Sequence, residues 1–154
     1  MSCRNIANSG ELDDKVLELL KILKPKRDVN FKNEAKGVAK KRIFMGFHEV
    51  LKYLKGDRIK AVIIARNIDW QEEAKRGVKN CSEIQIRCTS QGIPLISAST
   101  KRIIGRVLHK HPYVSAVGIL DISGYEEDFK KICELWKTDD AFKMYHLDQQ
   151  SIFA

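Results

Sequence analysis

The sequence predicts an α/β fold, in which a mixed sheet of about four strands is flanked by helices in a three-layer α-β-α sandwich. The first observation is a set of short apolar runs without polar alternation, which is typical of strands buried on both faces. The second is that segments with apolar residues at spacings of three and four, typical of helices, alternate with these runs. The runs occupy residues 61–65, 93–98 and 114–120.

The first expected helix covers residues 13–24, where either Asp13 or Asp14 can serve as the N-cap. Pro25 ends the pattern, because proline cannot continue a helix. The residues that share its apolar face are Val16, Leu19, Leu20 and Leu23. The segment 26–41 that follows is strongly basic, and it fits either a solvated linker or an arm that contacts RNA.

The next helix is expected to begin between Arg42 and Gly46 and to end at Lys55, where Gly56 provides a C-cap. Its helical spacing predicts that one face is buried in the core. The residues of that face are Phe44, Phe47, Val50, Leu51 and Leu54. The residues on or near the opposite face are Gly46, His48, Glu49 and Lys52.

The second half of the chain continues the alternation of strand and helix. Residues 66–79 are polar and are expected to begin as a loop at the end of the strand. A helix then starts at Asn80 or Ser82 and is closed by Gly92. The apolar stripe of this helix is Cys81, Ile84 and Cys88. Pro94 stands at the start of the following strand, where a missing N–H is tolerated.

Two further helices are expected. Ser99 or Thr100 caps a short one that Pro112 interrupts. Its inward residues are Ile103, Ile104, Val107 and Leu108, and its outward residues are Lys101, Arg102 and Arg106. The last helix carries an apolar stripe of Phe129, Ile132, Cys133 and Trp136.

The length of 154 residues suits a single main domain that buries a core without disulfides or metals. We expect an N-terminal helix with a basic connector (1–36), a binding domain (37–138) and a tail (139–154). No apolar run approaches the ~18 residues of a membrane span, and the first residues lack a secretory signal. We therefore expect a protein of the cytosol or nucleus without a membrane partner.

The composition argues against most kinds of enzyme. The sequence contains no phosphate-binding P-loop, no dinucleotide fingerprint and no nucleophile elbow. The four cysteines are scattered, and His109 and His111 lack further ligands at metal-binding spacing. The paired carboxylates Glu72–Glu73 and Glu126–Glu127 are expected to be solvated. No enzymatic activity, cofactor, metal or small-molecule substrate is expected.

The net charge of +8 favours a polyanionic partner. A helix that starts near Gly46 would present free backbone N–H groups to a phosphate. Glu49 should repel phosphates, but a carboxylate can accept hydrogen bonds from the edge of an exposed guanine. Alternatively, Glu49 only pairs with Lys52, which is worth about 0.2–0.5 kcal/mol, and the spacing alone leaves both interpretations open.

Five segments, taken in order, carry a resemblance to a known family. They are Lys41–Lys55, Ala61–Ile64, Gly92–Pro94, Gly105–Lys110 and Val114–Ile119. In these segments the chain resembles the kink-turn RNA-binding ribosomal-protein superfamily. It is most similar to the branch that binds the selenocysteine insertion sequence (SECIS). The basic connector and the last helix extend the resemblance over most of the chain.

The resemblance implies that the protein binds a kink-turn, an internal RNA loop with tandem sheared G·A pairs. In the family a G-x-N-E motif at a helix start reads the guanines, although His48 stands here where asparagine is usual. The residues that match the motif are Gly46 and Glu49, followed by Lys52. A second contact loop maps to residues 109–114, where Tyr113 or a histidine ring could stack on an unpaired base.

The residues expected to contact RNA are Lys40, Lys41, Arg42, Gly46, His48, Glu49, Lys52, Lys101, Arg102, Arg106, His109, Lys110, Tyr113 and Val114. Two structured RNAs are candidate partners. One is ribosomal RNA, bound by a ribosomal or ribosome-associated protein, and the other is a SECIS element in a selenoprotein message. The alternative is a protein-interaction module of the same fold that does not bind RNA, but the lysines of the connector favour RNA.

Overall fold

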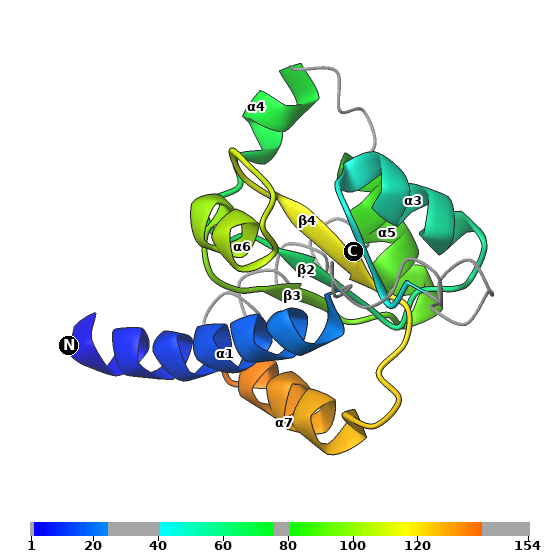
Figure 1. The fold of residues 1–154 in the computed structure, drawn as a ribbon. Coiled ribbons are helices and arrows are strands. Elements are labelled where there is room, and N and C mark those ends of the chain that lie inside the picture. Colours follow the sequence, from blue (N-terminus) through cyan, green and yellow to red (C-terminus); the bar gives the residue numbers. More distant parts are fainter. Residues whose placement is uncertain (1, 25–40, 76–80, 140–154) are drawn as a thin grey trace.

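The computed structural model describes residues 2–24, 41–75 and 81–139, and it has a mixed four-stranded sheet with helices on both faces (Figure 1). The expected connector, apart from Lys41, and the tail after residue 139 lie outside the described residues. The elements are α1 (Ser2–Leu23), β1 (Ile43–Met45), α3 (Phe47–Lys55), β2 (Ala61–Ile64), α4 (Trp70–Lys75), α5 (Cys81–Gln91), β3 (Leu95–Ser97), α6 (Lys101–Val107), β4 (Ala116–Ile119) and α7 (Glu126–Lys137).

The strand order is β1-β4-β2-β3, with β2 and β3 parallel and β4 antiparallel to both of its neighbours. Every residue of β2 and β4 is buried, which explains why their sequences lack polar alternation. Successive side chains still point to opposite faces, so Ile63 joins one core cluster while Val62 and Ile64 join the other. The predicted α/β sandwich with a mixed sheet is confirmed.

The two faces of the sheet carry different helices. Figure 1 shows α1 and α7 crossing below the sheet, with α3 and α5 on the opposite side. α6 contributes Ile104 and Leu108 to the cluster on the α1–α7 side. On the other side, Val50 and Leu54 of α3 pack with Ile84 and Cys88 of α5.

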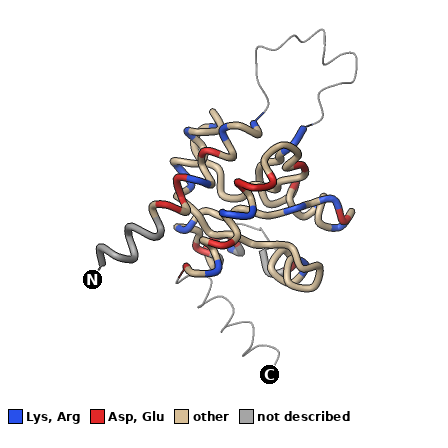
Figure 2. The backbone as a smooth tube through the Cα atoms, turned by 90° about the horizontal axis from the view of Figure 1, so that it is seen from below, with Lys and Arg blue, Asp and Glu red and all other residues tan. Residues whose placement is uncertain are grey.

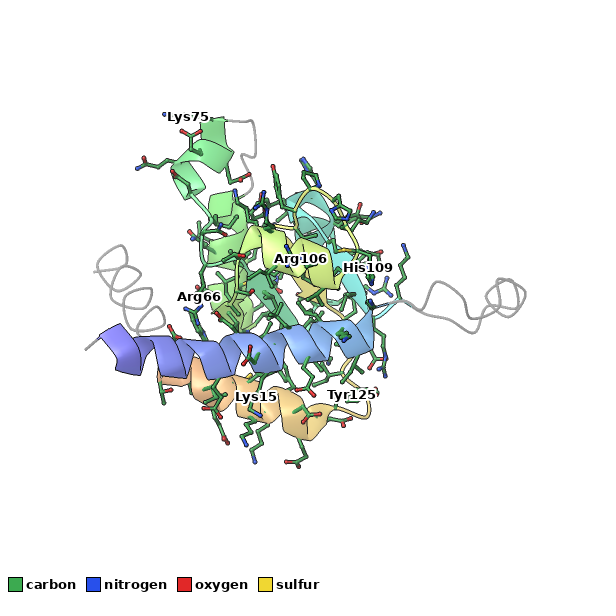
Figure 3. All side chains as sticks on the ribbon, turned by 60° about the vertical axis from the view of Figure 1, so that its left-hand side comes forward. Lys15, Arg66, Lys75, Arg106, His109 and Tyr125 are labelled. Carbon is green, nitrogen blue, oxygen red and sulfur yellow. The ribbon has the colours of Figure 1, made fainter. Side chains whose placement is uncertain are left out.

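The prediction for the first helix was wrong at its start, because α1 begins at Ser2. Asp13 therefore lies within the helix and is not its N-cap. Its Oδ1 accepts a hydrogen bond of 2.9 Å from Nε of Arg66, and Asp139 Oδ2 accepts one of 2.8 Å from Nη2 of the same arginine. We call these three residues the Arg66 clasp; Figure 3 shows Arg66 beside α1. It joins α1, the end of β2 and the end of α7.

The clasp also changes the protonation equilibrium of its arginine. Burial by itself lowers the pKa of Arg66, but hydrogen bonds to Asp139 and Asp13 outweigh it and raise the pKa above the ordinary value. Asp139 is 6% exposed, so its carboxylate depends on this guanidinium for compensation of its charge.

A short strand replaces the expected beginning of the second helix. Residues 43–45 form β1, and the helix proper starts at Phe47. Phe44 is therefore a half-buried strand residue and not part of the helix's core face. The other four residues of the predicted face are buried as expected: Phe47, Val50, Leu51 and Leu54.

Two further expectations need correction. The polar segment 66–79 begins as a loop, as expected, but it also contains α4, for which no helix was predicted. Ile103 was expected to face the core of α6, yet 40% of its surface is exposed. Of the two proposed caps of that helix, Thr100 is the one whose side chain accepts a hydrogen bond, from the backbone N–H of Ile103 at 3.3 Å.

Candidate nucleic-acid interface

The corner between β1 and α3 is built on Gly46. Its φ of 100° and ψ of 152° lie in a region that side-chain-bearing residues rarely adopt. The corner is fixed because the N–H of Gly46 donates to the carbonyl of Ala116 at 2.8 Å, while its own carbonyl accepts from Val50 at 3.0 Å. A Cβ at Gly46 would meet nothing within 4 Å. The first turn of α3, with its positive dipole end, therefore borders open space.

The exposed face of α3 carries the polar residues that the sequence placed there: His48, Glu49 and Lys52 are exposed. The alternative interpretation was that Glu49 only pairs with Lys52. Among the described residues, no ion pair joins these two side chains. The carboxylate of Glu49 is thus available at the surface beside the Gly46 corner.

The second predicted segment forms a loop that is held against α6. The N–H of Lys110 donates to the carbonyl of Gly105 at 2.8 Å, and that of Val114 donates to the carbonyl of Lys101 at 3.0 Å. A Cβ added to Gly105 would lie 2.6 Å from the carbonyl oxygen of Lys110 and 2.9 Å from the Cα of Tyr113. Only glycine lets the loop approach this closely.

Apart from Val114, the side chains of this segment are exposed, and so are several of α6. Arg106 and His109 are exposed at the end of α6, as Figure 3 shows, and Arg102 is exposed one turn earlier. Tyr113 is 41% exposed, and the amine of Lys101 lies 5.0 Å from the centroid of its ring. Such a cation–π contact presents an aromatic face with positive charge beside it.

A groove of about 340 Å³ joins these two regions. One wall comes from the β1–α3 corner through Met45, Gly46 and Phe47. The other comes from the loop after α6 through Lys110, His111, Tyr113, Val114 and Ser115. We call this space the groove. It brings together the two segments that the sequence singled out, although they are far apart along the chain.

Glu73 of α4 also lines the groove, and this residue was missed. It was expected to be solvated, but only 8% of its surface is exposed. A signal for α4 was present in the sequence. Asp69, three residues before Glu72, has the spacing of a capping box, and its Oδ1 accepts from the backbone N–H groups of Gln71 and Glu72 at 3.0 and 3.2 Å.

Arg42 lies away from the groove, at the opposite end of β1 from Gly46. Its carbonyl accepts from the N–H of Leu120 at 2.7 Å, and its Nη2 donates to the carbonyl of Ser123 at 2.6 Å. Its Nε is 3.6 Å from Asp121. Hydrogen bonds from Ser123, with Arg42 adding to them, lower the pKa of Asp121. Arg42 thus ties β1 to the connection that leads into α7.

The remaining expected contacts fall into different groups. Lys41 is exposed beside the ring of Phe44, whereas Lys40 lies outside the described residues. Val114 is buried, so only its edge reaches the groove. Figure 2 shows Lys and Arg distributed over several elements together with Asp and Glu. Charge alone therefore does not single out one region of the surface, whereas the groove brings the two predicted segments together.

The described ranges contain neither a metal-binding cluster nor a membrane-spanning helix. Within the described ranges, no three or more His, Cys, Asp or Glu side chains are placed to hold a metal ion. None of the helices in the described ranges is long and apolar enough to cross a bilayer. Cys88 is a free thiol whose burial raises its pKa to about 12, and burial also raises the pKa of Cys133.

Solved structures share the fold. A Giardia lamblia 15.5kD RNA binding protein superposes with a TM-score of 0.54 and 18% identity, over 86% of this chain and 90% of that one. A Bacillus halodurans C protein of unknown function superposes with a TM-score of 0.51 and 17% identity, over 79% and 95% of the two chains.

Curated relatives are more similar in sequence. Selenocysteine insertion sequence-binding protein 2 of Rattus norvegicus is 36% identical over 129 residues, which cover 82% of this chain and 15% of the relative. Selenocysteine insertion sequence-binding protein 2-like of Homo sapiens is 33% identical over 137 residues, or 88% and 12% of the two chains. The chain therefore spans only a small part of the length of these relatives.

The family profile agrees with both comparisons. Residues 30–128 match the description "Ribosomal protein L7Ae/L30e/S12e/Gadd45 family". These residues include β1, both walls of the groove and the first turn of α7. The chain belongs to the ribosomal protein L7Ae/L30e/S12e/Gadd45 family.

Proposed function

We propose that the chain is a non-enzymatic RNA-binding protein that recognises a kink-turn-like element in the groove. The observation that carries the proposal is the exposed carboxylate of Glu49, three residues after Gly46, whose corner forms the wall of the groove opposite the loop with Lys110 and Tyr113. Two facts support it: the family to which the chain belongs, and relatives whose names describe SECIS binding.

Glu49 would supply the base specificity. The amino and imino groups of guanine are hydrogen-bond donors, and a carboxylate is an acceptor-only partner that favours guanine over adenine. In a sheared G·A pair part of the guanine edge is left for such contacts. Gly46 would let the RNA approach closely, because its missing side chain leaves open space.

The other residues of the interface would provide affinity and position. Lys52 and the first turn of α3 would contact phosphates next to the guanines. Tyr113, with Lys101 against its ring, would stack on an unpaired base that leaves the internal loop. The remaining cations of this wall are Arg102, Arg106, His109 and Lys110. His48 would influence which kink-turn is preferred, since it replaces the usual asparagine.

A gel-shift experiment tests this function. The probes are a kink-turn RNA with tandem G·A pairs and a duplex of equal length in which those pairs are Watson–Crick pairs. We expect the Glu49→Gln variant to lose roughly 10- to 100-fold in affinity for the kink-turn, since one bidentate base contact contributes about 1–3 kcal/mol. Glu127→Gln, which removes the same charge from exposed α7, is the control and should change nothing.

Equal wild-type affinity for both RNAs, with no effect of Glu49→Gln, would contradict the proposal. The choice between the two candidate RNAs needs another measurement. Crosslinking in cells followed by sequencing of the bound RNA should return either SECIS elements or one site in ribosomal RNA. A single abundant protein partner without RNA would instead favour the interaction-module alternative.

A further inference from the structure

A pair of stacked aromatic rings lies outside the groove, between β1 and α3. The ring centroids of Phe44 and Tyr53 are 4.0 Å apart, with the ring planes inclined by 31°. Phe44 reaches this position because Ile43 and Met45, its neighbours in β1, pack into the cluster on the other face of the sheet. Both rings remain half-buried, since β1 is at the edge of the sheet.

Three cations surround the two rings. The amine of Lys41 lies 5.7 Å from the centroid of Phe44. The amine of Lys52 and the guanidinium of Arg58 lie 5.9 and 5.6 Å from the centroid of Tyr53. We call these five residues the aromatic surface. Cation–π contacts at exposed sites contribute about 0.5–1 kcal/mol each, which is enough to favour one position for an otherwise flexible side chain.

The positive charges of the aromatic surface are not neutralised by carboxylates of the described residues. No ion pair there involves Lys41, Lys52 or Arg58. Lys55 on the same helix differs, because its amine lies 3.9 Å from the carboxylate of Glu83 on α5. The aromatic surface therefore presents unpaired charge that is suited to an anionic ligand.

The aromatic surface is continuous with the exposed face of α3 that carries Glu49. Tyr53 follows Glu49 by four residues, so the two side chains are neighbours on one face of α3. Along α3, Lys52 lies between Glu49 and Tyr53, one turn after the first and directly before the second. A ligand that contacts Glu49 and extends along α3 toward Arg58 would therefore pass over the aromatic surface.

We propose that the aromatic surface is a second RNA contact, which binds phosphates of the stem that continues beyond the groove. The inference rests on the proposed function. The nine residues of α3 extend roughly 13 Å at 1.5 Å per residue, enough to follow a few stacked base pairs of the stem. Because the two rings already pack against each other, the cations are the groups that contact the ligand. The rings hold these cations in place.

The test compares two RNAs that share one kink-turn. The short RNA carries minimal stems. The long RNA is made in two versions, and each version extends one of the two stems by six base pairs. The Lys41→Gln/Arg58→Gln double variant removes two cations that lie outside the groove. The matched control is Lys55→Gln/Lys60→Gln, which removes the same charge from exposed positions nearby. Thermal melting confirms that each variant is folded.

We expect the Lys41→Gln/Arg58→Gln variant to bind the long RNA about 10-fold more weakly than wild type. The slope of log affinity against log salt should fall in magnitude by roughly 1.5, as expected for two lost phosphate contacts. Its affinity for the short RNA should stay within about twofold of wild type, because counterion release requires phosphates that this RNA lacks at the aromatic surface. The control should bind both RNAs as wild type does.

Failure of this inference is distinguishable from failure of the proposed function. The second contact would be overturned if the Lys41→Gln/Arg58→Gln variant lost equal affinity for both RNAs, or if the control variant lost as much affinity as it did. It would also be overturned if the double variant bound the long RNA as wild type does. The last result would leave the surface for an acidic protein partner. Failure of the proposed function would be detected with the short RNA alone, because its affinity would then be the same for wild type and for Glu49→Gln.

Discussion

The two walls of the groove both depend on a glycine, but for opposite physical reasons. Gly46 has free space around the missing Cβ, and its backbone conformation is what excludes other residues. Gly105 lies in an ordinary helix, and what excludes a side chain there is the backbone of the loop, 2.6 Å from an added Cβ. One wall is therefore set by local chain geometry, and the other by tertiary packing.

This difference predicts how strongly each wall responds to substitution. A strained corner can relax by moving a few dihedral angles, whereas two backbones forced apart must separate along their whole contact. We therefore expect substitutions in the loop wall to have the larger effects. The following predictions run from the largest expected effect to the smallest.

Gly105→Ala should be the most damaging change. The new methyl group would collide with the carbonyl of Lys110 and the Cα of Tyr113, so the loop must move away from α6. We expect a loss of about 1–3 kcal/mol in the free energy of unfolding, measured by urea denaturation, as for other overpacked sites. RNA affinity should also fall by more than tenfold.

Gly10→Ala is the matched control for this change. Gly10 lies within α1, and a Cβ there would meet nothing within 4 Å. Alanine should therefore stabilise the helix by roughly 0.5–1 kcal/mol. Equal effects of the two substitutions would show that the close approach at Gly105 does not determine the position of the loop.

Gly46→Ala should cost about 1–2 kcal/mol in unfolding free energy, because its φ of 100° is strained for alanine. RNA affinity should fall as well, since the corner sets the first turn of α3. Gly92→Ala serves as the comparison. Gly92 has a φ of 69° with open space around it at the end of α5, so its replacement should reduce stability without affecting RNA binding.

Tyr113→Leu tests the stacking surface of the loop wall. The ring is exposed and flanked by Lys101, so its removal should weaken RNA binding by about 1–3 kcal/mol, the range measured for stacking of one base. Fluorescence anisotropy with the kink-turn RNA would measure the change. The control is an RNA that lacks the unpaired base. If Tyr113→Leu weakens the binding of this RNA as much as that of the kink-turn RNA, the ring does not stack on that base.

Glu73→Gln should have the smallest effect on binding. The side chain borders the groove and is largely buried, so loss of its charge should reduce kink-turn affinity by about 0.5–1.5 kcal/mol, as for one hydrogen bond. Glu72→Gln, next to it but exposed, should leave affinity unchanged when titrated in parallel. The same response from both variants would place Glu73 outside the interface.

The sequence predicted the strands and the α3 wall well, because both depend on local pattern. The short, uninterrupted apolar runs of β2 and β4 are typical of strands buried on both faces, and both are buried throughout. The helical spacing of Phe47, Val50 and Leu54 assigned the faces of α3 correctly. Since the polar face follows from the buried one, the exposure of Glu49 was predictable as well.

The features that were missed depend on length or on distant partners. β1 has three apolar residues, too few for a strand period to differ from a helical one, so Phe44 was assigned to the wrong element. The hydrogen bond from Arg42 to the carbonyl of Ser123, 81 positions away, was not foreseen, while a contact of Arg42 with RNA remains a prediction. No pattern within a single segment reveals such a pairing. The domain boundaries at 36 and 138 remain a prediction.

The Arg66 clasp has a consequence for how this domain should be cut. A fragment limited to the family match at residues 30–128 would lose both of its aspartates and the end of α7. It would also lose five buried residues of α1, worth roughly 10 kcal/mol at about 2 kcal/mol each, which approaches the whole stability of a domain. These residues are Leu12, Val16, Leu19, Leu20 and Leu23. The smallest piece that folds independently should therefore reach from about the middle of α1 to Asp139, beyond both limits of the homologous region.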